Sequence, residues 1–187
     1  MKKIFLLFAI IISTFLITGC QKNYLHHVEI NVKDMGVIKV ELDESAAPIT
    51  VKNFIELAES GFYNGLSFHR IINGFMIQGG SPTFDSTGNS DKRIKGEFLE
   101  NGVNNTILHK RGVISMARAN DYNSASCQFF IMHQDDERLD GKYAAFGHVT
   151  EGMDIVDKIA EETKVEDNNG TVLRENQPII ESIIVID

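Results

Sequence analysis

The feature that most limits the fold of this chain is a regular alternation of apolar and polar residues near its start. Val28, Ile30 and Val32 alternate with polar or charged neighbours, and the same period returns over residues 38–42 after a break that contains Gly36. A period of two places successive side chains on opposite faces of a β-strand. The pattern therefore predicts a β-hairpin with a glycine-containing turn.

Short apolar runs of strand composition recur along the rest of the chain. They cover residues 66–72, 75–78, 112–117, 128–133, 145–149 and 179–186. Runs of this length favour strands over helices. No internal repeat or shift in composition divides residues 28–187. We therefore expect one mainly β domain whose many short strands close into a barrel.

Two segments have the helical period instead. Pro48 stands where the first residue of a helix would, and Gly61 supplies a stop, which predicts a helix over about 48–60. A second helix is predicted from Gly152 to about Glu161. We expect the two helices to cover the open ends of the barrel. The stretch 81–110 has no sustained period, and a loop this long in a compact domain is usually functional or marks a wrong assignment.

The N-terminal segment has the composition of a secretion signal. Lys2 and Lys3 precede an uncharged apolar run over residues 4–17. A transmembrane helix is the weaker alternative, because a membrane span needs about 20 apolar residues. The end of the run, Leu-Ile-Thr-Gly-Cys at 16–20, resembles a bacterial lipobox. That resemblance implies a mature chain that begins at a lipidated Cys20, anchored to the cell membrane outside the cytoplasm.

These features divide the chain into a signal peptide over residues 1–19, a lipidated cysteine with a polar tether over 20–27, and a domain over 28–187. The formal net charge is −8, and it becomes −10 once Lys2 and Lys3 are removed. A surface this acidic repels phosphate backbones and anionic headgroups, so we expect no nucleic-acid partner and attachment to the membrane through lipid alone. Cys127 is then left without a partner for a disulfide.

The first run with chemical content spans residues 68–80, Phe-His-Arg-Ile-Ile-Asn-Gly-Phe-Met-Ile-Gln-Gly-Gly. Counting by two places Phe68 and Arg70 on one face of a strand, and Met76 and Gln78 share a face after the break. A guanidinium, an amide and large apolar groups could thus meet on one surface. On these features alone the alternative stays open that Arg70 is a solvated strand residue and that Phe75 and Met76 are core.

Three more runs complete the pattern: Gly-Val-Ile-Ser-Met-Ala-Arg-Ala at 112–119, Ser-Ala-Ser-Cys-Gln-Phe-Phe-Ile at 124–131, and Leu-Asp-Gly-Lys-Tyr-Ala-Ala-Phe-Gly at 139–147. With these motifs in this order, the chain from about Val28 to Asp187 closely resembles the cyclophilin family of peptidyl-prolyl cis-trans isomerases. The resemblance also includes Gly-Glu-Phe at 96–98 of the long loop. It implies an eight-stranded antiparallel barrel capped by two helices.

The resemblance also implies a site. The catalytic arginine of the family falls on Arg70, and His69 beside it would brace the site or serve only the core. By the same matching, the residues that hold the proline and its peptide are Phe75, Met76, Gln78, Ala117, Arg118, Ala119, Gln128, Phe130, Leu139, Tyr143 and Phe146. The implied substrates are proline-containing segments of exported proteins. No cofactor or metal is implied, and we expect the protein to act as a monomer.

Three positions depart from the family pattern. Asn73 stands where the family usually has proline, but Gly74 still permits the bend. Tyr143 occupies a common histidine position and keeps an aromatic wall with a polar tip. Arg138 stands where many eukaryotic members carry tryptophan, which puts in doubt only the binding of the macrocyclic drug that names the family.

The sequence also offers alternatives to this function. Cys127 and His133 lie six residues apart, about 20 Å along one strand, which is too far for a thiol hydrolase pair. His26 and His27 lie in the predicted tether, and no other His or Cys pair has metal-ligand spacing. The serious alternative is a binding module that holds proline-containing segments, with any turnover incidental. The intact set of Arg70, Gln78 and Phe130 favours catalysis.

Overall fold

The computed structural model describes residues 24–187, so the predicted signal peptide and Cys20 lie outside the described residues. Its elements are β1 (Leu25–Val32), β2 (Gly36–Asp43), α1 (Pro48–Glu59), β3 (Phe68–Ile72), β4 (Met76–Gly79), β5 (Val113–Met116), β6 (Phe129–Met132), β7 (Ala145–Glu151), α2 (Met153–Glu162) and β8 (Ile180–Val185). Three short 3₁₀ turns complete the described chain, at residues 99–101, 137–139 and 174–176. No helix among residues 24–187 is both long and apolar enough to cross a membrane.

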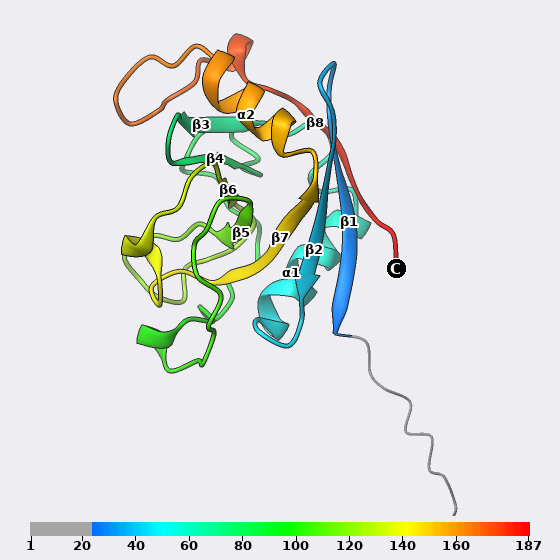
Figure 1. Cartoon of the computed structure of the whole chain (residues 1–187). Helices are drawn as coiled ribbons and strands as arrows, with labels where there is room; N and C mark the ends of the chain where they lie inside the picture. The colour runs from blue at the N-terminus through cyan, green and yellow to red at the C-terminus, as the bar shows by residue number, and fades with distance from the viewer. Residues whose placement is uncertain (1–23) are drawn as a thin grey trace, which may run out of the picture.

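The eight strands form one curled antiparallel sheet in the order β3-β4-β6-β5-β7-β2-β1-β8 (Figure 1). The edge strands β3 and β8 meet through a bridge between Ser67 and Ile179 and a hydrogen bond of 2.8 Å from the Ile180 N–H to the Leu66 carbonyl. This short contact replaces a continuous ladder between the two edges. The predicted mainly β class, with eight antiparallel strands and two helices, is confirmed, and the barrel is a strongly curled sheet whose edges touch.

The first hairpin begins earlier than its apolar alternation suggests. β1 already pairs with β2 at Leu25, which lies opposite Asp43, and His26 and His27 follow within the ladder. His27 is further fixed by a hydrogen bond of 2.9 Å to the Asp187 carboxylate at the C-terminus. The prediction that residues 20–27 form a tether is therefore wrong for residues 25–27, which belong to the sheet.

The helices lie towards opposite ends of the sheet, with α2 near the top and α1 near the bottom of the view (Figure 1). Pro48 begins α1 as predicted, because a proline in the first turn gives up no helical hydrogen bond. Ala47 offers no side-chain cap. The free N–H groups of Ile49 and Thr50 donate instead to the buried carboxylate of Glu97, at 3.1 and 2.7 Å. The loop that lacks a period thus supplies the cap of α1.

The buried side chains form two clusters. The larger fills the space between the sheet and the helices and centres on Phe54, whose ring lies 5.4 Å from Phe129 and 5.2 Å from Phe146. The smaller cluster has Met76, Val113, Phe130, Met132 and Ala145 as its buried members. Neighbours such as Phe129 and Phe130 fall in different clusters because a strand alternates its faces. The smaller cluster is the floor of the candidate site.

Candidate active site

A groove with a cavity of about 200 Å³ opens over the smaller cluster. The residues that line it are Arg70, Phe75, Met76, Gln78, Ala117, Arg118, Phe130, Leu139 and Tyr143. All nine belong to the set that the sequence predicts for the site. Ala119 and Gln128, also in that set, line an adjoining cavity of about 310 Å³.

Strand pairing brings the central residues of the groove together. Arg70 on β3 lies opposite Gln78 on β4, and Gln78 lies opposite Phe130 on β6. Side chains opposite one another on neighbouring strands share a face and lie about 5 Å apart at their Cβ atoms. The turn between β3 and β4 is closed by a hydrogen bond of 3.0 Å from the Phe75 N–H to the Ile72 carbonyl. Gly74 takes a φ of +78° there, a conformation that suits glycine, so the turn needs no proline at position 73.

The Arg70 guanidinium is held from two sides. Its Nε donates to the Asn169 carbonyl at 2.9 Å, and one terminal nitrogen donates to Gln78 Oε1 at 3.1 Å. Burial lowers the pKa of Arg70, with Tyr143 and Asp167 opposing the effect, but an arginine remains protonated throughout the usable pH range. The second terminal nitrogen has no hydrogen bond among the described residues. Arg70 is therefore fixed and keeps N–H donors free beside the groove.

A chain of amides fixes Gln78 in turn. Gln78 Nε2 donates to Gln128 Oε1 at 2.9 Å, and Gln128 Nε2 donates to the Gly88 carbonyl at 2.6 Å and to the Ser86 carbonyl at 3.2 Å. Both glutamines are more than nine-tenths buried, and buried amides in satisfied networks have little freedom to rotate. The network links the long loop to the arginine, so the orientation of the guanidinium depends on four segments of the chain.

His69 does not lie in the groove. Its side chain lines another cavity of about 170 Å³, which Arg70, Asp85 and Thr171 also line. Neither ring nitrogen has a hydrogen-bond partner among residues 24–187. Desolvation by burial, partly opposed by Asp85, lowers the pKa of His69 to about 4, so the ring is neutral at pH 7. His69 and Arg70 thus border the same second cavity, outside the groove.

The prediction that Phe146 lines the groove is wrong. Its ring is fully buried in the larger cluster, while Ala145 before it belongs to the smaller one. Tyr143 does stand at the groove, with its ring 6.0 Å from that of Phe130. Arg138 does not line the groove. Its Nε donates to the Asp136 carboxylate at 2.8 Å. The tryptophan position of other family members is thus a solvated ion pair here.

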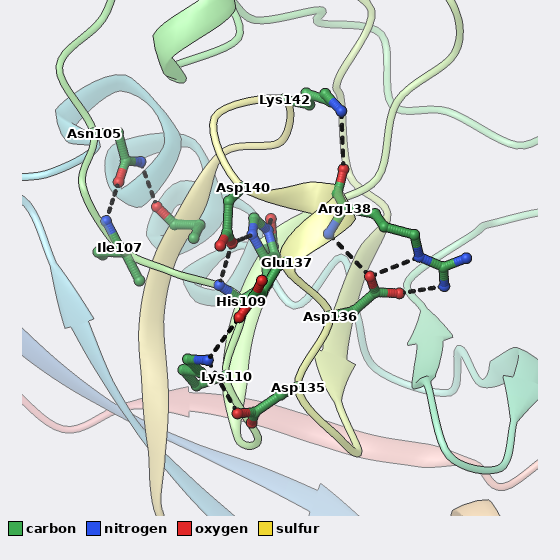
Figure 2. Close-up of polar contacts among 12 residues, drawn as sticks. Asn105, Ile107, His109, Lys110, Asp135, Asp136, Glu137, Arg138, Asp140 and Lys142 are labelled. Carbon is green, nitrogen blue, oxygen red and sulfur yellow. Dashed lines mark hydrogen bonds and ion pairs between the residues drawn. The ribbon is translucent and has the colours of Figure 1, made fainter.

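The sequence did not single out His109, which lies beneath the groove wall. Its ring stacks on Phe130 with 6.1 Å between centroids, and its nitrogens lie 3.1 Å from Asp140 Oδ1 and from Ser115 Oγ. Figure 2 shows His109 against Asp140 within a set of polar contacts that also holds the segment 135–142. Asn105 belongs to the same set and donates to the Ala145 carbonyl at 2.7 Å. These contacts fix the loops that carry Leu139 and Tyr143.

The alternative chemistries find no support in the geometry. Cys127 is fully buried and burial raises the pKa of its thiol, which disfavours the reactive thiolate. His133 is engaged elsewhere, because its Nδ1 accepts from the Gly74 N–H at 2.9 Å and its Nε2 lies 3.2 Å from Asp157. Among residues 24–187 no group of three or more His, Cys, Asp or Glu side chains is placed to hold a metal ion.

Residues 27–185 match the family described as "Cyclophilin type peptidyl-prolyl cis-trans isomerase/CLD". The chain belongs to the cyclophilin family. Members of this family with similar sequences include the peptidyl-prolyl cis-trans isomerase of Helicobacter pylori (strain ATCC 700392 / 26695), which is 45% identical over 133 residues, 70% of this chain and 78% of that protein. Peptidyl-prolyl cis-trans isomerase A of Dickeya dadantii (strain 3937) is 43% identical over 131 residues, 67% of each chain.

A crystal structure of a cyclophilin-type isomerase from Cryptosporidium parvum superposes on this cyclophilin with a TM-score of 0.76 at 29% identity, covering 88% of this chain and 99% of that one. A second crystal structure of the same protein, in the presence of the dipeptide Ala-Pro, gives a TM-score of 0.75 at 30% identity and covers 86% and 99% of the two chains. The fold and family agree with the sequence resemblance, and the protein is a peptidyl-prolyl cis-trans isomerase.

Proposed function

We propose that this cyclophilin isomerises X-Pro bonds in exported proteins outside the cytoplasm, with Arg70 as its catalytic residue and a lipid on Cys20 as its anchor. One observation carries the catalytic part. Arg70 is fixed by Asn169 and Gln78, keeps free N–H donors, and borders an apolar groove of about 200 Å³. The crystal structure of the related Cryptosporidium parvum isomerase in the presence of Ala-Pro supports a proline-containing ligand.

The reaction breaks no bond. Rotation about an amide crosses a barrier of roughly 18–20 kcal/mol because the C–N bond is partly double. The two isomers of an X-Pro bond differ by only about 0.5–1 kcal/mol, yet they exchange over tens to hundreds of seconds. At the twisted transition state the proline nitrogen becomes pyramidal and gains a lone pair, so a donor aimed at that nitrogen stabilises the transition state alone.

Arg70 suits this task because its charge is permanent and its N–H groups lie in one plane. Within the described residues no carboxylate lies within ion-pair distance of its guanidinium, which leaves the charge available to a ligand. A preorganised donor of this kind is typically worth about 2.7–4 kcal/mol, by analogy with oxyanion holes.

The apolar walls of the groove add a second contribution. Phe75, Met76, Phe130 and Leu139 remove water from the proline ring and favour the twisted amide, which is less dipolar than the planar one. Together with the donor, a total near 7 kcal/mol, on the order of 10⁵-fold in rate, is reasonable. The chemistry requires no nucleophile and no proton transfer.

Replacing Arg70 tests the mechanism. Arg70→Ala should lower kcat/KM for a short X-Pro peptide by about 10²–10³-fold while the peptide binds with nearly unchanged Kd. Arg138→Ala removes an exposed guanidinium that faces away from the groove, and it should leave catalysis unchanged. Equal losses of affinity and rate in Arg70→Ala would instead mark Arg70 as a ground-state binding residue. Binding without any catalysis in the unchanged protein would favour the holdase alternative.

The lipid anchor follows from the sequence at residues 16–20. A single acyl chain gives marginal membrane binding, whereas two or more give stable anchoring. Cys20→Ser should therefore release the processed protein from membranes and leave the isomerase activity of the released domain intact. A Cys20→Ser protein that is processed but still sediments with membranes would refute the anchor.

A further inference from the structure

A cavity larger than the groove lies beside it. This cavity, which we call the side cavity, has a volume of about 310 Å³. Its floor is the pair Gln78 and Gln128, and it shares Arg70, Ala117 and Arg118 with the groove. A peptide whose proline fills the groove therefore has a neighbouring residue at the mouth of the side cavity, since an extended chain advances only about 3.3 Å per residue.

The charges around the side cavity are all of one sign. Arg70, Arg93 and Arg118 contribute to its lining, and no aspartate or glutamate does. The formal net charge of the whole chain is −8, so this concentration of guanidinium groups runs against the overall composition. The nearest part of the long loop does carry Asp85, but that carboxylate is bonded within its own turn, to the Thr87 N–H at 2.8 Å, and borders the cavity of His69 instead.

Arg118 is held rigidly in the wall of the side cavity. Its guanidinium carbon lies 4.6 Å from the ring centre of Tyr143 and 4.8 Å from that of Tyr122. It donates to the Lys142 carbonyl at 2.9 and 3.0 Å and to the Ala119 carbonyl at 2.9 Å. All of these partners are neutral, so the contacts fix the position of the charge without cancelling it.

Arg93 differs from Arg118 because it is free. It is exposed at the rim of the side cavity and makes no hydrogen bond or ion pair with any other described residue. Its neighbour Lys92, by contrast, is 3.2 Å from Glu56. A long, unpaired arginine at the rim can move to meet an anion that enters the cavity.

We propose that the side cavity takes the carboxylate side chain of an aspartate or glutamate close to the X-Pro bond, so that the enzyme prefers proline segments flanked by an acidic residue. The inference rests on the proposed function and names the class of segment that the enzyme selects. Arg93 and Arg118 are its specificity-determining residues, and Gln78 and Gln128 form the polar floor. A partly exposed charge pair of this kind acts on encounter rate and specificity more than on chemistry.

The test uses acetylated, amidated Ala-Ala-Ala-Pro-Ala-Ala peptides in which one alanine at a time is replaced by Glu or by Gln. The kcat/KM of isomerisation is measured by NMR exchange spectroscopy on the protein at about 20 mM ionic strength. Glu and Gln have nearly the same shape, so their ratio at each position reports the charge alone. We expect one or two adjacent positions at which Glu exceeds Gln by about three- to tenfold, with the ratio falling as salt is raised to about 0.5 M.

Two matched variants distinguish a charge effect within the side cavity from an effect of the net charge of the protein. Arg93→Gln removes the rim charge, and the ratio of Glu to Gln should fall towards one at the selected position. Lys95→Gln removes the same charge from an exposed residue two positions away that does not line the cavity, and it should leave the ratio unchanged. Arg93→Glu should reverse the preference, so that a Lys peptide is used better than its Gln counterpart.

The outcomes are distinct. If the enzyme isomerises every peptide and the Glu and Gln peptides have equal kcat/KM at all positions, the side-cavity assignment is overturned and the isomerase function stands. A Glu preference that Arg93→Gln and Lys95→Gln reduce equally would also overturn it, because the preference would then come from net charge. Absence of catalysis on all peptides would overturn the proposed function and this inference with it.

Discussion

Mild acid should destabilise the folded chain through His69. Burial lowers the pKa of this histidine to about 4, whereas an unfolded chain has a histidine pKa of about 6.5. Between these two values the unfolded state binds a proton that the folded state does not, so stability falls as the pH falls through this window. The same shift keeps the ring neutral from pH 6 to 9, and we expect the catalysed rate to be flat over that range, without a step near 6.5.

The size of the effect follows from the two pKa values. One unit of pKa shift corresponds to about 1.36 kcal/mol, so the free energy of unfolding should drop by about 2 kcal/mol between pH 7 and pH 5 and by about 3 kcal/mol at pH 4. The aspartates with lowered pKa values, among them Asp85 and Asp157, act mostly at lower pH, because their contribution is lost only as they protonate. The window from pH 7 to 5 therefore isolates the histidines.

Urea unfolding followed by far-UV circular dichroism measures this drop, since the chain has no tryptophan to report by fluorescence. His69→Gln and His69→Phe both remove the titrating group, and the decrease of unfolding free energy from pH 7 to 5 should shrink by about 2 kcal/mol in each. His109, whose pKa burial also lowers, is present in all three proteins and cancels from the comparison. An equal pH dependence in the unchanged protein and in both variants would refute a neutral, buried His69.

Three further perturbations test other parts of the structure. Glu97→Gln removes one hydrogen-bond acceptor and the negative charge at the start of α1, and it should lower the free energy of unfolding by about 2–4 kcal/mol. Glu59→Gln changes an exposed residue at the other end of the helix and should alter the free energy of unfolding by less than about 0.5 kcal/mol. Urea unfolding measures both variants. Tyr143→Phe should change kcat/KM by less than about twofold, whereas Tyr143→Ala should lower it by about tenfold through loss of the groove wall; a large effect of Tyr143→Phe would show that the hydroxyl acts. Cys127 should resist alkylation in the folded protein and react only on unfolding, which mass spectrometry of iodoacetamide-treated samples measures; rapid labelling under native conditions would contradict its burial.

The spacing of apolar residues predicted the strands and helices well where one face of the element is buried and the other is exposed to solvent. The alternation from Val28 to Leu42 and the helical period after Pro48 both correspond to elements of the structure. The start of β1 escaped prediction because Leu25, His26 and His27 have no apolar alternation. Their strand conformation comes from backbone pairing with β2 and from the contact of His27 with Asp187. Such long-range partners leave no signal in the local sequence.

The error at Phe146 has a related cause. The first three residues of β7, Ala145, Phe146 and Gly147, are all buried. No alternation of polar and apolar residues therefore indicates which of the two clusters each side chain faces. A shift of one residue in a strand exchanges its two faces. Both clusters are apolar, and composition therefore could not distinguish the floor of the groove from the core.

The partners of the site residues were the least predictable part. Arg70 is fixed by the backbone of Asn169, 99 positions along the chain, and Gln128 is fixed by carbonyls of the long loop. A backbone carbonyl is the same group at every position, so no residue type announces it as a partner. The sequence did not predict a role for Arg93 either, because unpaired surface arginines are common and only the structure shows the cavity beside this one.

The way in which Arg70 is held bears on why the site suits this reaction. A carboxylate partner would fix the guanidinium more strongly, but it would also satisfy the charge that a proline nitrogen must meet in the transition state. The structure fixes Arg70 through a carbonyl and an amide oxygen instead, and both acceptors are neutral. Neutral acceptors restrict rotation without forming an ion pair with the guanidinium. The lowered pKa of Arg70 is the sign of that arrangement, because burial without a paired anion disfavours the charged form. Under the proposed mechanism, this unfavourable burial of charge is offset as a lone pair develops beside the guanidinium, which happens only as the X-Pro bond twists.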